Sequence, residues 1–166
     1  MIGLILASGL GTRLKEETKD RPKCMVDVGG KPVLERIADH MNKHGIWRIV
    51  VNLHAFPDVV MKHFGQRFLY LYEPVPMGEF STVSLVKDWA DTSEPMVVMN
   101  GDTITNISPR QGSGRYCIDG VHVGTTVFDP KTEQYQSLTN REVLGWYQDM
   151  GTPPGLAAAR EHYAEH

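Results

Sequence analysis

Cysteine is scarce in this sequence, with only Cys24 and Cys117 among 166 residues. Neither belongs to a Cys-x-x-Cys pair, which leaves a disulfide framework and a thiolate zinc site without support. We therefore expect two buried or idle thiols. A chain of this length with 41% hydrophobic residues is about one domain and can bury a sizeable core.

Long hydrophobic runs and dense basic clusters are also missing. No stretch approaches the about 18 apolar residues of a membrane span, and Ile2–Leu6 is too short and lacks the basic flank of a signal peptide. The formal charge is -3, from 17 basic and 20 acidic side chains, without a Lys/Arg run that would suit duplex nucleic acid. We expect a cytoplasmic protein that binds small ligands, and neither nucleic acid nor a membrane.

Short apolar segments alternate with helical patterns along the first hundred residues. The expected strands, buried on both faces, are Ile2–Leu6, Ile49–Leu53, Phe68–Tyr72 and Met96–Met99. The expected helices run from Pro32 to before Gly45, from near Pro57 to Phe64–Gly65, and from about Ser81 to Trp89. This alternation predicts an α/β fold with an open, mostly parallel sheet.

The first of these helices places Leu34, Ile37, Ala38 and Met41 on one face, which should pack on the sheet.

The second half of the chain is less regular. Glycine and proline in the segment 107–120 indicate turns, so a surface excursion is expected there. Strands are expected at Val121–Phe128 and near Val143–Tyr147. A last helix should follow Pro153–Pro154.

The segment LILASGLGTRL, residues 4–14, runs from the first strand into glycine-rich backbone that can approach a phosphate chain. It is not a dinucleotide fingerprint, because Leu14 stands where the third glycine is needed. A Walker loop is also absent, since the later Gly29-Gly30-Lys31 is followed by Pro32. A nicotinamide cofactor and a P-loop ATPase are thus both disfavoured.

Two cations accompany this turn, Arg13 within it and Lys23 ten residues further on. Arginine can bind phosphate oxygens as a bidentate fork and lysine as a point charge, so the pair could straddle a triphosphate. Asp102 follows the expected strand Met96–Met99 directly, where ligands collect in open α/β sheets. A carboxylate there can hold Mg²⁺ with some of its waters retained.

Five segments together resemble the sugar-1-phosphate nucleotidylyltransferase family, the nucleotide-sugar pyrophosphorylases. They are LASGLGTRLKEETKDRPKCMVDVGGKPVLE, VNLHAFPDVVMKHFG, YEPVPMG, VVMNGDTI and, near the other end, WYQDMGTPPGLAAA. The first four lie within residues 1–107, which the resemblance covers. The resemblance implies a Rossmann-like fold of the nucleotide-diphospho-sugar transferase type, with helices on both faces of a mixed, mostly parallel sheet.

The resemblance also implies one nucleotidyltransferase domain over residues 1–166. Its parts would be a nucleotide-binding core at 1–107, a reduced acceptor region at 108–148, and a closing metal motif with a C-terminal helix at 149–166. In such enzymes a sugar-1-phosphate oxygen attacks the α-phosphorus of a nucleoside triphosphate, and pyrophosphate leaves. The expected function is therefore a Mg²⁺-dependent transfer that forms a nucleoside-diphosphate sugar.

Carried over residue by residue, the resemblance implies that Arg13, Lys23 and Asp102 are catalytic and that Asp102 and Asp149 bind the metal. Spacing alone could not join the two aspartates, because Asp149 lies 47 residues (149 - 102) after Asp102. The implied nucleotide-binding residues are Leu6, Ala7, Ser8, Gly9, Gly11, Thr12, Arg13, Lys23, Glu73, Met77, Gly78 and Asp102.

The sequence departs from the family pattern at Glu16 and at Glu79-Phe80, which leaves the base open. Glu79 could accept hydrogen bonds from a guanine edge, but a solvent-facing side chain fits equally well. The acceptor-phosphate lysine motif has no clear match. The cations available for an acceptor phosphate are Arg110, Arg115, Lys131 and Arg141, and surface solvation suits each of them.

Two alternatives stay open at this point. The reduced acceptor region would suit a cytidylyltransferase that acts on a small non-sugar phosphate such as phosphocholine. It would also suit a nucleotide-binding regulatory subunit without turnover. A homo-oligomer is possible in each case, because a shortened lobe could leave apolar surface for a partner.

Overall fold

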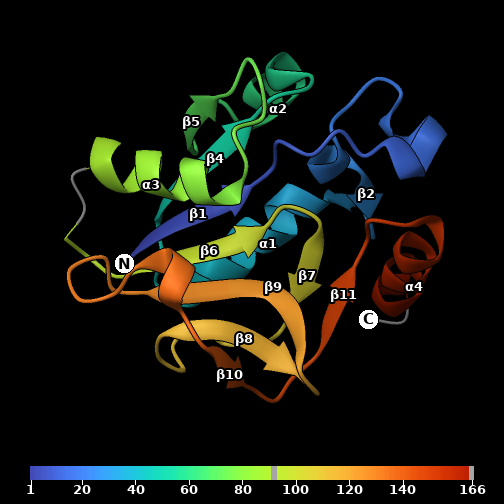
Figure 1. Ribbon diagram of the computed structural model, residues 1–166. Coiled ribbons are helices and arrows are strands. Elements are labelled where there is room, and N and C mark those ends of the chain that lie inside the picture. Colours follow the sequence, from blue (N-terminus) through green and yellow to red (C-terminus); the bar gives the residue numbers. More distant parts are fainter. Residues whose placement is uncertain (91–92, 165–166) are drawn as a thin grey trace.

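The computed structural model describes residues 1–90 and 93–164, and a seven-stranded sheet forms its centre (Figure 1). The strand order is β10-β8-β9-β6-β1-β4-β5. The strands are β1 Ile2–Leu6, β4 Arg48–Leu53, β5 Leu69–Tyr72, β6 Met96–Asn100, β8 Gly114–Ile118, β9 Val121–Phe128 and β10 Asn140–Glu142. Only β9 is antiparallel to its neighbours β6 and β8. The open, mixed and mostly parallel sheet is thus confirmed.

Helices cover both faces of this sheet, as expected (Figure 1). The helices α1 (Val33–Lys43) and α2 (Pro57–Phe64) pack on one face, and α3 (Glu79–Trp89) packs on the other. Alternation along β1 supplies both layers, because Ile5 belongs to the core under α1 and Leu4 to the core under α3. Gly3 lets α1 approach closely, since a Cβ there would lie 2.7 Å from Met41 Sδ.

The periodic face predicted for the first helix is confirmed, because all four of its side chains are at most 1% exposed. Pro32 stands just before α1, and Gly45 follows its end with a φ of 75°. The third helix begins at Glu79, two residues before its expected start. The last helix, α4 (Pro153–Ala164), buries Leu156 and Ala159.

The expectation that the Phe68–Tyr72 strand is buried on both faces is wrong. The strand β5 is at one edge of the sheet, and Leu69 and Tyr72 are exposed. A short apolar run does not distinguish a central strand from an edge strand, because both need apolar residues on at least one face.

The predicted surface excursion over 107–120 is also wrong, because β8 lies within it and pairs with β9. Tyr116 and Cys117 in β8 are at most 1% exposed. The flanking glycines end this strand instead of preventing it. The strand expected near Val143–Tyr147 is replaced by two short strands on either side, β10 and β11 (Tyr147–Asp149).

Short elements complete the described chain. They are the 3₁₀ helices η1 (Thr12–Thr18), η2 (Lys23–Met25) and η3 (Tyr135–Ser137), and the strands β2 (Asp27–Val28), β3 (Lys31–Pro32) and β7 (Thr103–Thr105). The strand β2 pairs with β3, and β7 pairs with β11, in two small antiparallel sheets. The second pairing brings the chain after β6 beside the chain before α4.

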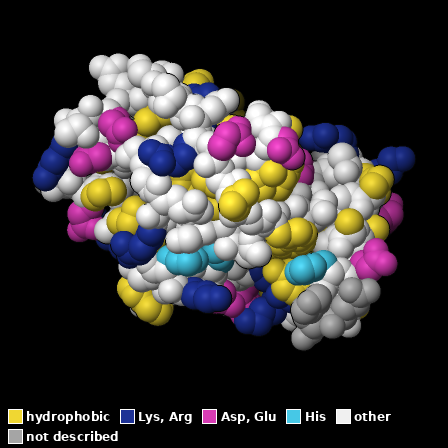
Figure 2. Space-filling view, turned by 90° about the horizontal axis from the view of Figure 1, so that it is seen from below, with side chains coloured by type: hydrophobic (Ala, Val, Ile, Leu, Met, Phe, Trp, Pro, Cys, Tyr) yellow, Lys and Arg dark blue, Asp and Glu magenta, His cyan; other side chains and the backbone are white. Residues whose placement is uncertain are grey.

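Both cysteines are free and buried, as expected. Burial raises the pKa of the Cys24 thiol to about 12, which keeps it protonated and unreactive. No helix within residues 1–90 and 93–164 has the length and apolar character needed to cross a bilayer. Figure 2 shows acidic and basic side chains interspersed on one face of the molecule.

Histidines anchor the segment after β7 to the C-terminal end of α1. His40 Nε2 lies 2.9 Å from the carbonyl oxygen of Ile107. Arg110 donates from Nε and Nη2 to the carbonyl oxygen of His44, at 2.8 and 2.6 Å. The two imidazole rings meet edge to face, with their centroids 4.8 Å apart.

These contacts predict a protein that loses stability on mild acidification. Burial lowers the pKa of His40 and of His44, and nearby positive charge lowers both further. The unfolded chain therefore binds more protons than the folded chain just below the ordinary histidine pKa of about 6.5. The free energy of unfolding, measured with urea, should fall as the pH drops from neutral towards about 5.

His40→Gln should weaken this pH dependence, whereas His63→Gln, at an exposed position on α2, should leave it intact. If the free energy of unfolding changes equally with pH in the two variants, the assignment of the pH dependence to His40 would be contradicted.

Candidate active site

The site lies at the carboxyl ends of β1 and β6. These strands are neighbours with Leu6 opposite Asn100, and the helices that follow β1 and precede β6 lie on opposite faces of the sheet. Ligands bind at such a switch point in open α/β sheets. A pocket of about 510 Å³ opens there. It is lined by Leu6, Ala7, Ser8, Gly9, Leu10, Gly11, Thr12, Arg13, Lys23, Cys24, Pro76, Asn100, Gly101, Asp102 and Gly151.

A buried hydrogen-bond network fixes the start of the glycine-rich turn. Ala7 donates its backbone N–H to Asn52 Oδ1 at 2.6 Å, and Asn52 donates from Nδ2 to Glu73 Oε1 at 3.0 Å. Asn52 and Glu73 are each 1% exposed. The network fixes the start of the turn relative to β4 and to the segment after β5.

Glu73 has more internal partners. Its Oε1 accepts from Thr82 Oγ1 at 2.6 Å, and its Oε2 accepts from the Met77 backbone N–H at 3.2 Å. Glu73, Met77 and Gly78 are outside the residues that line the pocket, where their neighbour Pro76 stands. Their contact with a nucleotide stays a prediction, and burial disfavours it for Glu73, which instead positions the loop.

The position of Gly11 requires a residue without a Cβ. Its φ is 66°, and a Cβ would lie 2.9 Å from Thr18 Cγ2 and 3.0 Å from Lys23 Cβ. Thr18 Oγ1 also donates to the Gly11 carbonyl oxygen at 2.9 Å. The turn therefore passes directly over the base of Lys23.

Gly11→Ala should weaken both folding and nucleotide binding. The left-handed backbone costs a non-glycine residue roughly 1–2 kcal/mol, and the steric contact should also displace Lys23. Gly30→Ala is the matched control, because φ is 79° there but nothing lies within 4 Å of the added Cβ. Thermal unfolding should show a similar backbone cost in both variants, and only Gly11→Ala should lose affinity in a nucleotide titration. Equal affinities would contradict the steric role of Gly11.

Asp102 lines the pocket because the carboxyl end of β6 packs closely on the carboxyl end of β1. Gly101 donates its N–H to the Leu6 carbonyl oxygen at 2.9 Å, and a Cβ on Gly101 would lie 2.6 Å from that oxygen. Only glycine fits there. Asp102 is consequently placed beside the glycine-rich turn.

The pairing of β7 with β11 brings the second aspartate to the same place. Asp149 is in register with Thr103, and the Met150 N–H donates to the Asp102 carbonyl oxygen at 2.9 Å. The Gly151 N–H donates to Asp149 Oδ1 at 2.6 Å. Asp149 is absent from the pocket lining, but its carboxylate lies at the edge of the pocket through Gly151.

Three charged groups converge around Gly151. Lys23 Nζ donates to Asp102 Oδ2. A Cβ on Gly151 would lie 2.8 Å from Lys23 Nζ, 2.9 Å from Asp149 Oδ1 and 3.7 Å from Asp102 Oδ2. The three side chains thus share one small region at the end of the sheet.

The donor set here suits magnesium. Protein sites commonly hold Mg²⁺ through one or two carboxylates together with substrate phosphates and waters. No group of three or more metal-ligating side chains occurs in the part of the chain that the structure describes, so an all-protein cage is not formed there. Asp102 and Asp149 fit a site in which two carboxylates hold the ion together with substrate phosphates and waters.

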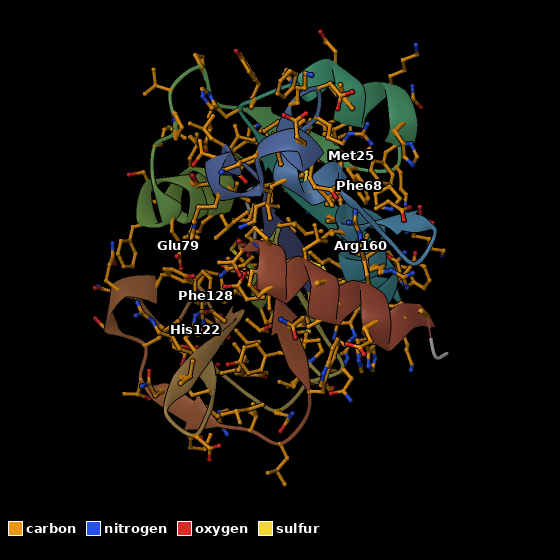
Figure 3. All side chains as sticks on the ribbon, turned by 90° about the vertical axis from the view of Figure 1, so that its right-hand side faces the viewer. Met25, Phe68, Glu79, His122, Phe128 and Arg160 are labelled. Atoms are coloured by element: carbon orange, nitrogen blue, oxygen red, sulfur yellow. The ribbon has the colours of Figure 1, made fainter. Side chains whose placement is uncertain are left out.

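Arg13 lies on the open side of the pocket, exposed to solvent. None of the described residues forms an ion pair with its guanidinium. The side chain is therefore available to an anion. Arg13 belongs to η1, and α4 holds this element through Arg160 (Figure 3). Arg160 donates to both carboxylate oxygens of Glu17 in η1, at 2.7 and 2.9 Å.

Sequence reasoning missed several residues of the site. Asn52 and Gly151 have structural roles that depend on contacts from other strands, and no local pattern marks them. Asn100 and Gly101 adjoin Asp102 in the segment VVMNGDTI, so their place beside the pocket could have been inferred from that segment.

A smaller pocket of about 180 Å³ lies between the start of α3 and the segment 108–148, and it is lined in part by Glu79, Arg115 and His122. Glu79 is exposed to solvent, and its Oε1 accepts a hydrogen bond from Tyr135 Oη. Figure 3 shows Glu79 and His122 on the side of the molecule away from Arg160.

Of the candidate acceptor cations, two are engaged with main-chain oxygens. Arg110 binds the carbonyl oxygen of His44, and Arg141 donates to the carbonyl oxygen of Ser113 at 2.8 Å. Lys131 is exposed and Arg115 is half-buried.

Known proteins share this architecture and parts of this sequence. A D-glycero-alpha-D-manno-heptose 1-phosphate guanylyltransferase from Campylobacter jejuni is 35% identical over 116 residues, which are 64% of this chain and 50% of that protein. A glucose-1-phosphate cytidylyltransferase from Salmonella typhimurium is 42% identical over 71 residues, 43% of this chain and 28% of that protein. The chain spans about half the length of the first relative and 28% of the length of the second.

A solved structure, UDP-glucose pyrophosphorylase from Acinetobacter baumanii, superposes with a TM-score of 0.76 at 16% identity, covering 100% of this chain and 95% of that one. This similarity supports the fold of nucleotide-diphospho-sugar transferases. Residues 3–108 match the MobA-like NTP transferase domain, and they contain the glycine-rich turn, Lys23 and Asp102. The chain belongs to the family of MobA-like NTP transferase domains, as a relative of the sugar-1-phosphate nucleotidylyltransferases.

Proposed function

We propose that this chain transfers a nucleoside monophosphate from a nucleoside triphosphate to a sugar-1-phosphate, with Mg²⁺, and releases pyrophosphate. The observation that carries the proposal is the convergence of Lys23, Asp102 and Asp149 around Gly151, beside a glycine-rich turn. Arg13 lines the same pocket and forms no ion pair with any residue that the structure describes. The relatives named as sugar-1-phosphate guanylyl- and cytidylyltransferases add support.

The residues of the pocket can divide the work of such a transfer. Backbone N–H groups of the turn and the Arg13 guanidinium would bind the β- and γ-phosphates. Lys23 would neutralise oxygens of the α-phosphate and of the leaving group. Mg²⁺ held by Asp102 and Asp149 would supply further positive charge where negative charge builds up.

The chemistry needs no covalent protein nucleophile. An acceptor phosphate oxygen forms a bond to the α-phosphorus as the bond from this phosphorus to the bridging oxygen of the β-phosphate breaks. The electron pair of that broken bond leaves with pyrophosphate, and no proton has to move. The main task of the site is therefore to hold the anions in line and to balance their charge.

The base and the acceptor are part of the test. Each of four nucleoside triphosphates should be combined with a panel of sugar-1-phosphates and with phosphocholine, and pyrophosphate release measured. The proposal expects release with a sugar-1-phosphate. Release with CTP and phosphocholine alone would favour the cytidylyltransferase alternative. Thermal stabilisation by nucleotide with no pyrophosphate from any pair would favour a regulatory subunit.

A cytoplasmic location belongs to the same proposal, because nucleoside triphosphates and sugar phosphates are the expected substrates. A homo-oligomer stays a prediction, which sedimentation velocity can test.

A further inference from the structure

The position of the Lys23 ammonium is unexpected for a group that binds only phosphate. Its Nζ is paired with Asp102 Oδ2, and the side chain is only 12% exposed, compared with 28% for Asp102. The point 2.8 Å from this Nζ, where a Gly151 Cβ would stand, is also 2.9 Å from Asp149 Oδ1. The ammonium therefore pairs with Asp102 and lies near Asp149, with which it forms no ion pair. These are the two carboxylates that the proposed function assigns to the metal.

Charge balance explains why a cation belongs there. Two carboxylates held close together repel each other, and a positive charge between them relieves the repulsion. The β7–β11 pairing and the Gly151 N–H hold Asp149 beside Asp102. Lysine supplies one compact charge on a flexible stem, which can move once a stronger attraction appears.

We propose that Lys23 is a placeholder for the divalent cation, which keeps Asp102 and Asp149 neutralised until a nucleotide draws its ammonium onto the phosphates. This inference rests on the proposed function, because it assigns the same two carboxylates to the metal. Its consequence is an order of binding: the free metal ion competes with Lys23 and binds weakly, whereas the metal and the triphosphate bind together.

Gly151 and Gly11 make this exchange sterically feasible. The space beside Gly151 lets the ammonium approach both carboxylates, since a Cβ there would be too close to Nζ. At its other end, Lys23 packs under Gly11, in the turn expected to hold the phosphates. The carbon stem is thus anchored between the two places that the ammonium would occupy.

The test measures binding of Mn²⁺ alone by electron paramagnetic resonance, without nucleotide, to the wild type and to Lys23→Met. Methionine keeps the length of the stem and removes the charge. If the ion pair blocks the site for about nine-tenths of the time, removal of the lysine should tighten Mn²⁺ binding about tenfold. Lys19→Met, at a side chain 73% exposed, is the matched control and should bind Mn²⁺ like the wild type.

Thermal unfolding gives a second readout. Millimolar Mn²⁺ should raise the melting temperature of Lys23→Met and leave that of the nucleotide-free wild type nearly unchanged. Lys23→Arg, which keeps a positive charge, should behave like the wild type. Equal Mn²⁺ affinity and equal thermal shifts for the wild type and Lys23→Met would overturn the proposal.

A third measurement separates this inference from the proposed function. The wild type is titrated with Mn²⁺ in the presence of a non-hydrolysable nucleoside triphosphate analogue. The result is compared with Mn²⁺ binding to the same analogue without protein. Failure of the protein to bind the metal and nucleotide together would contradict the proposed function itself. Tight joint binding, with no gain for Lys23→Met alone, would leave that function intact and overturn only the placeholder role.

Discussion

Asp102→Asn is expected to lower pyrophosphate release by at least about 10³-fold. Asparagine keeps the size of the side chain but removes the charge that would hold Mg²⁺ at the carboxyl end of β6. The folded state loses its ion pair with Lys23, and the amide can still accept a hydrogen bond from that ammonium. The free energy of unfolding should therefore change by only about 1 kcal/mol.

The measurement is steady-state pyrophosphate release with the best substrate pair, together with a urea unfolding curve. Asp88→Asn, at an exposed position on α3, is the control and should keep full turnover. Full turnover in Asp102→Asn would refute the assignment of this carboxylate to catalysis. A large loss of stability without a specific loss of turnover would make Asp102 a structural residue.

Asn52→Leu should have the largest effect on folding among the changes considered. Leucine has nearly the same volume but offers no polar atom, so the buried Ala7 N–H loses its acceptor and Glu73 loses a donor. Each unpaired buried group costs about 1–3 kcal/mol, and the two losses together should reduce the free energy of unfolding by about 2–4 kcal/mol.

Nucleotide affinity should fall with it, because the glycine-rich turn begins at Ala7. Urea unfolding gives the stability, and a nucleotide titration at low temperature gives the affinity of the molecules that stay folded. Asn42→Leu, at a half-buried position on α1, provides the matched substitution and should cost far less. A small and equal loss in both variants would show that the buried network contributes little.

The parts of the fold that could be predicted from the sequence are those with a clear local period. The continuous apolar run of β1 and the 3.6-residue spacing of α1 each depend on a few neighbouring residues. The strand β8 was missed because its flanking glycines resemble turn sequences. Its burial is decided by pairing with β9.

The candidate site divides in the same way. The glycine-rich turn, Arg13 and Asp102 stand in short segments whose chemistry is visible from the residues themselves. The Lys23–Asp102 pair joins positions 79 residues apart, and no spacing rule connects them. The internal partners of Glu73 could not be predicted from the sequence, because a carboxyl in a loop sequence carries no mark of burial.

The sequence by itself determined the α/β class, the strand that leads into the glycine-rich turn, and the cations and carboxylate that the proposed function assigns to a nucleotide. These depend on side-chain period and backbone freedom, which act between near neighbours in the chain. Only the tertiary structure decided that Asp149 meets Asp102 and that the Lys23 ammonium lies beside both. That meeting depends on the pairing of β7 with β11 and on the close approach of β6 to β1, which arise when distant segments pack together.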